Sequence, residues 1–165
     1  MAMKLLVLAL FVAPLLASAA LQPGDSISPY EVLNTKTGDE YCQVCVYGAK
    51  EGKIVAFGKI GDADFWADLK KLQVWAEKYP KLGIFAQVID SKDAKAIQVE
   101  AAKQGVKFPV VVAVAADWDE AYQVKGVSRT IYYAKKNNKI AWTGVGLEST
   151  AEQALAEKIA VDLAS

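Results

Sequence analysis

Residues 52–89, GKIVAFGKIGDADFWADLKKLQVWAEKYPKLGIFAQVI, contain the pattern that decides the fold of this chain. The apolar run Lys53–Phe57, introduced by Gly52, has the length and composition of a buried central strand. A second apolar run, Leu82–Ile89, predicts another strand of the same kind. Two such strands separated by a segment of helix length indicate a β-α-β unit, in which the strands lie parallel in one sheet.

The segment between these two strands has the periodicity of an amphipathic helix. It begins with a capping aspartate, Asp62 or Asp64, and it ends before Pro80, which cannot continue a helix. Its apolar side chains recur at steps of three and four residues: Phe65, Trp66, Leu69, Leu72, Trp75 and Tyr79. We therefore expect a helix that runs to about Tyr79 and packs one aromatic-rich face against the sheet.

The rest of the chain extends this unit in both directions. Upstream, two strands flank a turn at 34–38, and downstream, helices and strands alternate before a closing hairpin and helix. The predicted segments are strands at Ile27–Leu33 and Tyr41–Tyr47, a helix at Ser91–Gln104, a strand at Pro109–Val114, a short helix around Asp119–Val124, strands at Thr130–Ala134 and Ile140–Val145, and a final helix from about Ser149 to Leu163. This order predicts an α/β fold in which a mixed sheet lies between helices.

The composition excludes several classes of function. The chain has 165 residues, with 19 Lys and Arg against 19 Asp and Glu, and it has no His. Without His, one chain cannot form a Ser-His-Asp or Cys-His catalytic unit, a His-ligated metal site or an imidazole proton shuttle. Because positive and negative charges balance, the sequence has no excess of positive charge to bind nucleic acid, and we expect no nucleic-acid partner. The length fits one domain, and the oligomeric state stays open.

The first 20 residues have the form of a signal peptide. A positive start, Met1–Lys4, precedes the apolar run Leu5–Leu16, and Ala17–Ala19 has the small-x-small form of a cleavage site. The apolar run is too short to cross roughly 30 Å of hydrocarbon as a helix. We expect cleavage after residue 19 or 20, a mature domain at 21–165 without a membrane span, and a periplasmic or secreted location. An uncleaved anchor is the alternative.

Several stretches, taken in order, resemble the thioredoxin-like superfamily. Gly24–Tyr30 is similar to its Gly-Asp-x-x-Pro-aromatic entry, and Gly52–Phe57 to its first core strand. Phe108–Val112, followed by Ala121–Val127, resembles the stretch that leads to its cis-proline loop. The resemblance is to the redoxin branch, which holds exported thiol–disulfide proteins and peroxiredoxin relatives. It implies a three-layer sandwich over 21–165, with a central mixed sheet, helices on both faces and an N-terminal β-hairpin.

The chain departs from this family where the family carries out its chemistry. The redox-active cysteine of the family follows the first core strand, but Gly58–Phe65 contains no Cys. The peroxiredoxin pattern Pro-x-x-x-Thr-x-x-Cys is also missing. The family's cis-proline should follow Val127, where Ser128 and then Arg129 stand. We therefore do not expect ordinary thioredoxin or peroxidase chemistry at that position.

Both cysteines lie earlier, in the stretch Tyr41–Gly48, which reads YCQVCVYG. Similar Cys-x-x-Cys-x-Tyr-Gly stretches occur in exported thioredoxin-like proteins, and Cys-x-x-Cys indicates redox chemistry in this fold class. In an extended strand the Cα atoms of Cys42 and Cys45 would stand about 10 Å apart, whereas a disulfide requires less than about 7 Å. An oxidised pair therefore predicts a turn or a helical geometry at the two intervening residues.

Three roles for this pair stay open. The first is a structural disulfide, although so short a loop contributes only roughly 2 kcal/mol by closure entropy. The second is thiol–disulfide exchange with a protein partner, in which Cys42 attacks and Cys45 resolves, or the reverse. Asp39 and Glu40 disfavour a thiolate at Cys42, and Lys50 offsets them only if the chain folds back. The third is metal binding or intermolecular pairing.

No cofactor is predicted. Val46 rather than His follows the second cysteine, which excludes c-type haem attachment through that motif. A closed zinc site would have two thiolates and no imidazole, so it would require carboxylates or a second chain. Asp62, Asp64 and Asp68 stand close together at the start of the predicted helix, where capping and solvated-face roles explain them better than a metal cluster.

Arg129 is the only Arg of the chain, and with Ser128 it occupies the loop at which the family contacts substrates. A guanidinium there is suited to holding a carboxylate or a phosphate, so both residues are candidate substrate-binding residues. The alternatives for Arg129 are a surface charge and an internal ion pair.

The sequence as a whole leaves two hypotheses for the function. The first is an exported thiol–disulfide redox protein acting through Cys42 and Cys45. The second is a non-catalytic binding or scaffold module with a structural disulfide.

Overall fold

The structure, a computed structural model, describes residues 20–164. The predicted signal peptide lies outside these residues, apart from Ala20. The strands are β1 (Glu31–Asn34), β2 (Glu40–Cys42), β3 (Gly52–Gly58), β4 (Leu82–Val88), β5 (Val110–Ala113), β6 (Thr130–Lys135) and β7 (Ile140–Val145). The helices are α1 (Gln43–Val46), α2 (Ala63–Lys78), α3 (Ala94–Lys103), α4 (Trp118–Tyr122) and α5 (Ser149–Ala164).

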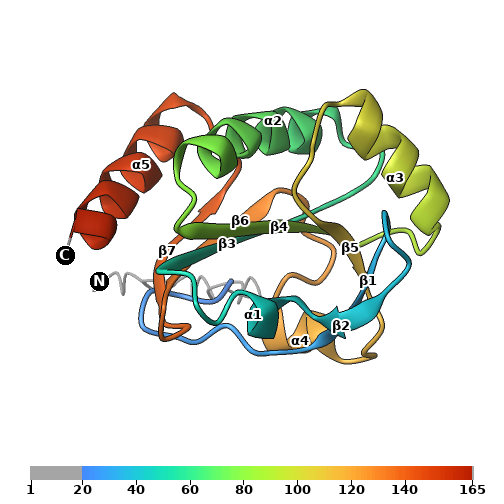
Figure 1. Ribbon diagram of the computed structural model, residues 1–165, viewed down its shortest axis with the longest axis horizontal. Coiled ribbons are helices and arrows are strands. Elements are labelled where there is room, and N and C mark those ends of the chain that lie inside the picture. Colours follow the sequence, from blue (N-terminus) through green and yellow to red (C-terminus); the bar gives the residue numbers. More distant parts are fainter. Residues whose placement is uncertain (1–19, 165) are drawn as a thin grey trace, which may run out of the picture.

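The seven strands form one mixed sheet in the order β2-β1-β5-β4-β3-β6-β7. Strands β3, β4 and β5 run parallel, and β6 pairs antiparallel with β3. Helices α2, α3 and α5 cover one face of the sheet, and α1 and α4 lie against the other (Figure 1). This arrangement is the predicted three-layer sandwich with its N-terminal hairpin, β1 and β2, at one edge of the sheet. Among residues 20–164 no helix is long and apolar enough to cross a membrane.

Strand β3 is the centre of this sheet, and all seven of its residues are buried. Successive side chains of a strand point to opposite faces. Ile54 and Ala56 therefore pack with α2, α3 and α5, whereas Val55 and Phe57 pack in a second cluster on the face of α1 and α4. The apolar run 53–57 thus fills two separate layers of core, as a strand buried on both faces requires.

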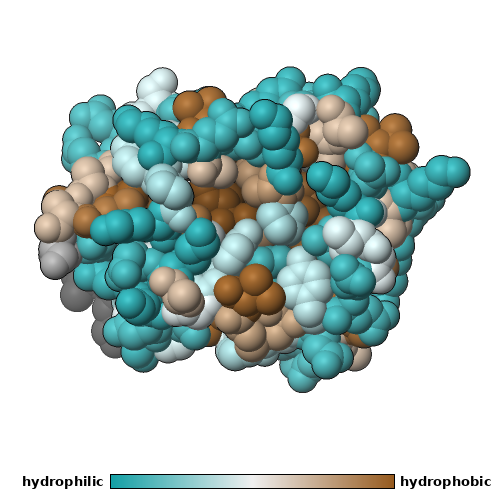
Figure 2. Space-filling view, viewed as in Figure 1, coloured by the Kyte–Doolittle hydropathy of each residue, from teal (hydrophilic) through white to brown (hydrophobic). Residues whose placement is uncertain are grey.

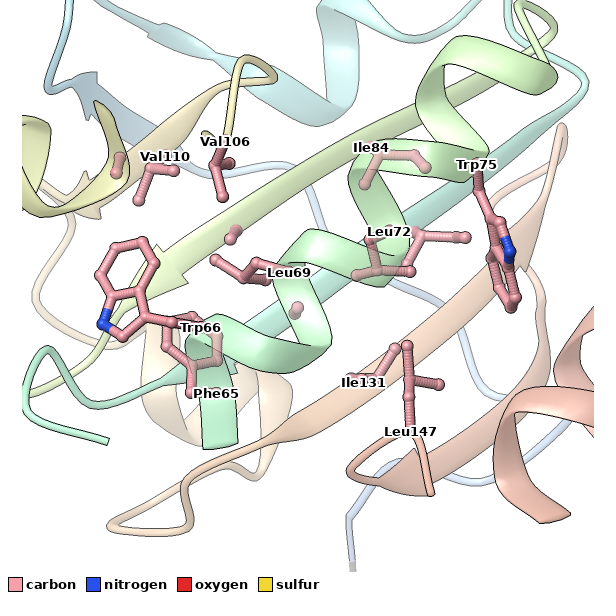
Figure 3. Packing of buried hydrophobic residues seen from close by; sticks show 14 of the residues in the cluster. Phe65, Trp66, Leu69, Leu72, Trp75, Ile84, Val106, Val110, Ile131 and Leu147 are labelled. Carbon is pink, nitrogen blue, oxygen red and sulfur yellow. The ribbon is translucent and has the colours of Figure 1, made fainter. Parts of the chain in front are cut away.

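Helix α2 begins at the predicted cap. The carboxylate of Asp62 accepts hydrogen bonds from the N–H groups of Asp64 and Phe65, at 3.0 and 3.2 Å. The helix ends at Lys78, one residue before the predicted end. Its buried side chains point toward Ile84 of β4 and Ile131 of β6 (Figure 3). In the space-filling view, hydrophilic side chains cover most of the surface, and apolar residues gather between α2 and the strands beneath it (Figure 2).

The N-terminal segment 20–30 covers part of the opposite face. Leu21 and Ile27 are buried there, and the N–H of Leu21 donates to the hydroxyl of Tyr132 at 3.2 Å. Five rings contact one another on this face: Tyr30, Phe57, Trp118, Tyr122 and Tyr132. Without this segment and its aromatic neighbours, the second core layer would face water.

The predicted N-terminal hairpin differs from the observed one in both strands. The first strand covers only Glu31–Asn34, because Pro29 has no N–H to donate and Ser26 makes only a single bridge, to Lys139 of the β6–β7 turn. The second strand stops at Cys42 instead of Tyr47. The chain turns into α1 at that point. Val44 can then be buried in the second core cluster, on the face of α1 and α4, which we call the lower core.

Candidate functional site

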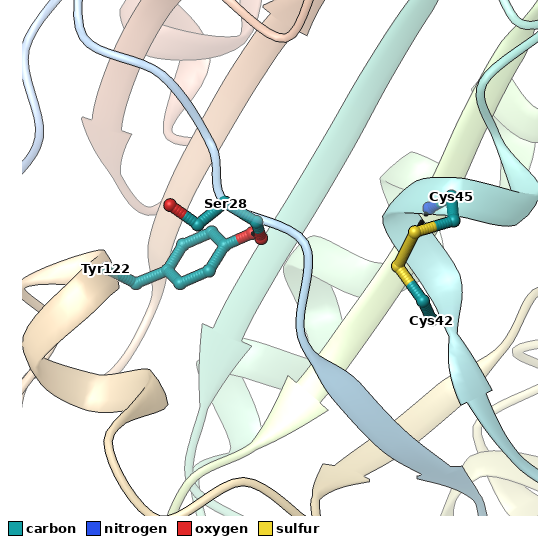
Figure 4. Close-up of a disulfide and its surroundings, with 4 residues drawn as sticks. All are labelled: Ser28, Cys42, Cys45 and Tyr122. Carbon is teal, nitrogen blue, oxygen red and sulfur yellow. Dashed lines mark hydrogen bonds between the residues drawn. A yellow bond between two sulfur atoms is a disulfide. The ribbon is translucent and has the colours of Figure 1, made fainter.

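The two cysteines form a disulfide at the junction between β2 and α1 (Figure 4). Cys42 is the last residue of β2 and the cap of α1, and Cys45 lies within α1. Their Cα atoms are 5.2 Å apart, within the range that a disulfide permits. The expectation that an oxidised pair requires helical or turn geometry between the two cysteines is confirmed.

The two residues between the cysteines anchor this turn in the fold. Gln43 and Val44 are both buried. The hydroxyl of Tyr41 donates to Oε1 of Gln43 at 2.5 Å, and Nδ2 of Asn34 donates to the hydroxyl of Tyr41 at 3.0 Å. Since β1 holds Asn34, the disulfide turn is tied by side chains to the neighbouring strand as well as to the core.

The two sulfur-bearing residues differ in environment. Cys45 is exposed, whereas Cys42 is half-buried and packs against the lower core cluster. The N–H of Cys45 donates to Sγ of Cys42 at 3.1 Å. The ammonium of Lys50, which could have offset the acidic residues before Cys42, donates instead to the carbonyl oxygen of Pro80 at 2.8 Å.

The position at which the sequence resemblance predicts a redox centre has different chemistry in this chain. The hydroxyl of Ser128 donates to Oδ2 of Asp62 at 2.6 Å, and the N–H of Lys59 donates to that hydroxyl oxygen at 3.2 Å. The two stretches that depart from the family, Gly58–Phe65 and Ser128–Arg129, therefore meet in space. Residues 20–164 contain no cis peptide bond. A carboxylate and a hydroxyl occupy this position, and neither is a thiol nucleophile.

The hydrogen bond from Ser128 is the main cause that lowers the pKa of Asp62 below its usual value. Partial burial of the carboxylate acts in the opposite direction, and the N–H groups of Phe65 and Asp64 add to the lowering. Asp62 therefore carries its negative charge over the whole neutral range, as a helix cap and as the acceptor for Ser128.

Arg129 forms an internal ion pair, which is one of its predicted alternatives. Its Nε and Nη2 atoms donate to the two carboxylate oxygens of Asp68 at 2.8 and 3.2 Å, and Nη2 also donates to Glu148 at 2.7 Å. Asp68 is only 2% exposed and accepts a further hydrogen bond from the N–H of Leu147 at 3.0 Å. These contacts join α2, the turn before β6 and the loop before α5. Substrate binding by Arg129 and Ser128 stays a prediction, and both side chains already have partners within the chain.

The solvated-face role predicted for Asp68 is wrong, because the carboxylate is buried under Arg129. A signal for this was present in the sequence. Asp68 stands one turn after Phe65 and beside Leu69, on the apolar face of the helix, and a charged residue at such a position is rarely buried without a partner. Among residues 20–164 no group of three or more Cys, Asp or Glu side chains is arranged to hold a metal ion.

The two positions are far apart in the sheet. Cys42 ends β2 at one edge, and Asp62 follows β3, with β1, β5 and β4 between the two strands. Four strand spacings of about 4.8 Å give a separation of about 19 Å across the sheet. The disulfide therefore shares no side-chain partner with the Asp62–Ser128 pair, and any chemistry at the cysteines is independent of that pair.

Solved structures with this architecture include thiol–disulfide proteins and a peroxidoxin. A proposed protein disulfide isomerase from Bacteroides thetaiotaomicron superimposes with a TM-score of 0.74 at 12% identity, over 88% of this chain and 92% of that chain. The thioredoxin domain of a thiol-disulfide oxidoreductase from Bacteroides vulgatus gives 0.67 at 14% identity, over 84% and 98%. Peroxidoxin BcpB from Mycobacterium tuberculosis gives 0.70 at 13% identity, over 87% and 97%.

No family model matches the sequence, and no curated protein matches it either. The structural likeness nevertheless defines the fold: the chain is a thioredoxin-like α/β domain of the architecture found in thiol-disulfide oxidoreductases, as the resemblance predicted. Within that fold, this chain has its Cys-x-x-Cys disulfide on the N-terminal hairpin, and it has Asp62 and Ser128 at the position that the resemblance assigned to the family's cysteine and proline.

The ion pair of Arg129 predicts a difference between two aspartates of α2. Asp68→Asn leaves the guanidinium without its buried partner and should lower the free energy of unfolding by about 3 kcal/mol. Asp64 contacts the same guanidinium at 3.8 Å, but its side chain is 77% exposed. Asp64→Asn should therefore lower the free energy of unfolding by less than about 1 kcal/mol. Urea denaturation at neutral pH measures both, and equal losses would contradict the assignment.

The Asp62–Ser128 hydrogen bond predicts a pH effect. Because the folded pKa of Asp62 is lowered, its ionisation contributes stability above its unfolded pKa of about 3.9, and this is lost as the pH falls through the folded pKa. Ser128→Ala should raise the folded pKa of Asp62 and shrink this contribution. Carboxyl carbon NMR titration measures that pKa. Thr37→Ala is the control, since its hydroxyl accepts from the N–H of Asp39 in the turn between β1 and β2, and strands β5 and β4 lie between β1 and the strand that precedes Asp62. An unchanged pKa of Asp62 in Ser128→Ala would refute the hydrogen bond as the cause of the lowering.

Proposed function

We propose that this protein is an exported thiol–disulfide redox protein that acts through the Cys42–Cys45 disulfide. The observation that carries the proposal is a Cys-x-x-Cys disulfide in which Cys45 is exposed and whose turn is held by buried Gln43 and Val44, on a thioredoxin-like fold. The anchored turn keeps both sulfurs in position when the bond between them opens. Exposure of Cys45 lets a thiol of another protein reach the disulfide, as exchange requires.

The chemistry needs no cofactor. A thiolate of a partner attacks one sulfur, the bond between Cys42 and Cys45 breaks, and a mixed disulfide forms while the other cysteine leaves as a thiolate. A second thiolate of the partner then attacks the mixed disulfide. The partner dithiol ends as a disulfide and Cys42 and Cys45 end as thiols, so two electrons pass from the partner to this protein. The reverse sequence oxidises the pair again.

A short disulfide loop favours a redox role over a structural one. Closing a loop with two intervening residues contributes only roughly 2 kcal/mol by the entropy argument. The turn already has Val44 in the core and Gln43 bonded to Tyr41, so the fold around it has other contacts that hold it. Because this disulfide adds little stability, a role as a reactive group explains it better than a structural role.

The second candidate is a non-catalytic binding or scaffold module. It is favoured by the hydrogen bond between Asp62 and Ser128 and by the ion pair between Arg129 and Asp68. These contacts occupy the loop ends at which the resemblance places thiol exchange and substrate contacts. In this function the disulfide only shapes the edge of the sheet.

The redox proposal predicts that the protein accelerates the reduction of insulin by dithiothreitol. The double variant Cys42→Ser/Cys45→Ser should fold, by circular dichroism, and should show no acceleration. Thiol counting on protein from its native compartment should show no free thiol before reductant and two after it. Absence of acceleration together with a reduction potential below about −300 mV would favour the scaffold function instead.

Export predicts a shortened N-terminus. N-terminal sequencing of protein from the exported fraction should begin at Ala20 or Leu21. Leu8→Arg, which places a charge in the apolar run of the signal, should leave the full-length chain in the cytoplasm, whereas Lys4→Arg keeps the positive start and should be exported normally. An intact N-terminus in the exported fraction, or export of the Leu8→Arg variant, would contradict this location.

A further inference from the structure

We infer that exchange begins at Cys45 and that Cys42 is the leaving sulfur. This order of attack rests on the proposed function and specifies it. It follows from two features of the described residues: which cysteine a thiol can reach, and which sulfur has a hydrogen-bond donor that stabilises negative charge.

Access favours Cys45. The incoming thiolate must approach the attacked sulfur from the side opposite the breaking bond, so the attacked residue has to face solvent. Cys45 is exposed, and its neighbours Val46, Gly48 and Ala49 are exposed as well. Val46 is 62% exposed, and none of these three neighbours carries a charge. Cys42 is half-buried and packs against the core cluster on the face of α1 and α4, so its sulfur is less accessible to an attacking thiol.

The hydrogen bond within the turn prepares Cys42 to leave. The N–H of Cys45 donates to Sγ of Cys42 at 3.1 Å. When the disulfide breaks with attack at Cys45, negative charge develops on the sulfur of Cys42, and this donor stabilises the charge. A thiol of lower pKa leaves faster, so the donor accelerates attack at Cys45. Attack at Cys42 would place the developing charge on Cys45, for which the described contacts show no such donor.

Attack at Cys45 conserves atoms and electrons without any further reactant. The thiolate R–S⁻ forms a bond to Sγ of Cys45 while the bond between Cys45 and Cys42 breaks and its electron pair goes to Sγ of Cys42. The products are the mixed disulfide R–S–S–Cys45 and the thiolate of Cys42. No proton has to move in this step, and the reductant is a thiol. A second thiolate, or Cys42 in the reverse direction, then resolves the mixed disulfide.

The test is to identify the sulfur that carries the first adduct. Oxidised wild-type protein is mixed briefly with glutathione and then quenched with N-ethylmaleimide in acid, and Cys42 and Cys45 are assigned by fragmentation mass spectrometry. We expect glutathione on Cys45 and N-ethylmaleimide on Cys42, by about tenfold over the opposite pattern. The opposite pattern would overturn the order of attack while leaving the redox function intact. No adduct, with the denatured oxidised protein reacting normally, would overturn both.

Single-cysteine variants support the assignment. In reduced proteins, at a pH at which each remaining thiol is ionised, Cys42→Ser should trap a mixed disulfide with a disulfide substrate faster than Cys45→Ser does, because Cys45 is the exposed residue. A faster reaction of Cys45→Ser would contradict the inference.

Discussion

Burial of β3 on both faces is the constraint on which the rest of this structure depends. A strand whose side chains alternate between two core layers requires each layer to be covered. Helices α2, α3 and α5 cover one layer through their apolar faces. The other is closed by the N-terminal segment, α4 and α1, which contribute the buried side chains Leu21, Tyr122 and Val44. The turn that carries the disulfide forms where Val44 enters this second layer, so the position of the disulfide is a consequence of how the sheet is covered.

The position at which the resemblance predicts reactive groups has structural contacts in this chain. Where the resemblance places a cysteine and a cis-proline, this chain has a helix cap, Asp62, bonded to the hydroxyl of Ser128. The adjacent Arg129 is directed onto the buried carboxylate of Asp68. Each of these groups has a partner, and together they join α2 to the turn before β6 and to the loop before α5. In the proposed redox function, the chemistry lies at the N-terminal hairpin, which has a separate set of contacts through Asn34, Tyr41 and Gln43.

How much of this could be predicted depended on whether the deciding interactions were local. Helix α2 was predicted almost completely, because its cap and its apolar spacing lie within the segment itself. The hairpin β6–β7 was predicted for the same reason, with its turn residues between two apolar runs. The second N-terminal strand was predicted too long, because the burial of Val44 and the bond from the Tyr47 hydroxyl to the Ile84 carbonyl are contacts with distant parts of the chain. The burial of Asp68 was missed because its partner, Arg129, is 61 residues away.

The sequence by itself determined the α/β class, the order of the elements, the lack of any His-based chemistry, and the close spacing of the only two cysteines. These are properties of composition and of local pattern, which need no knowledge of distant neighbours. Only the tertiary structure decided that the cysteines meet in a helical turn, that Cys45 is exposed while Cys42 is half-buried, and that Asp62 and Ser128 form a hydrogen bond. Exposure and pairing are set by segments that are far apart in the chain and are brought together by the burial of the central strand, so no local pattern contains them.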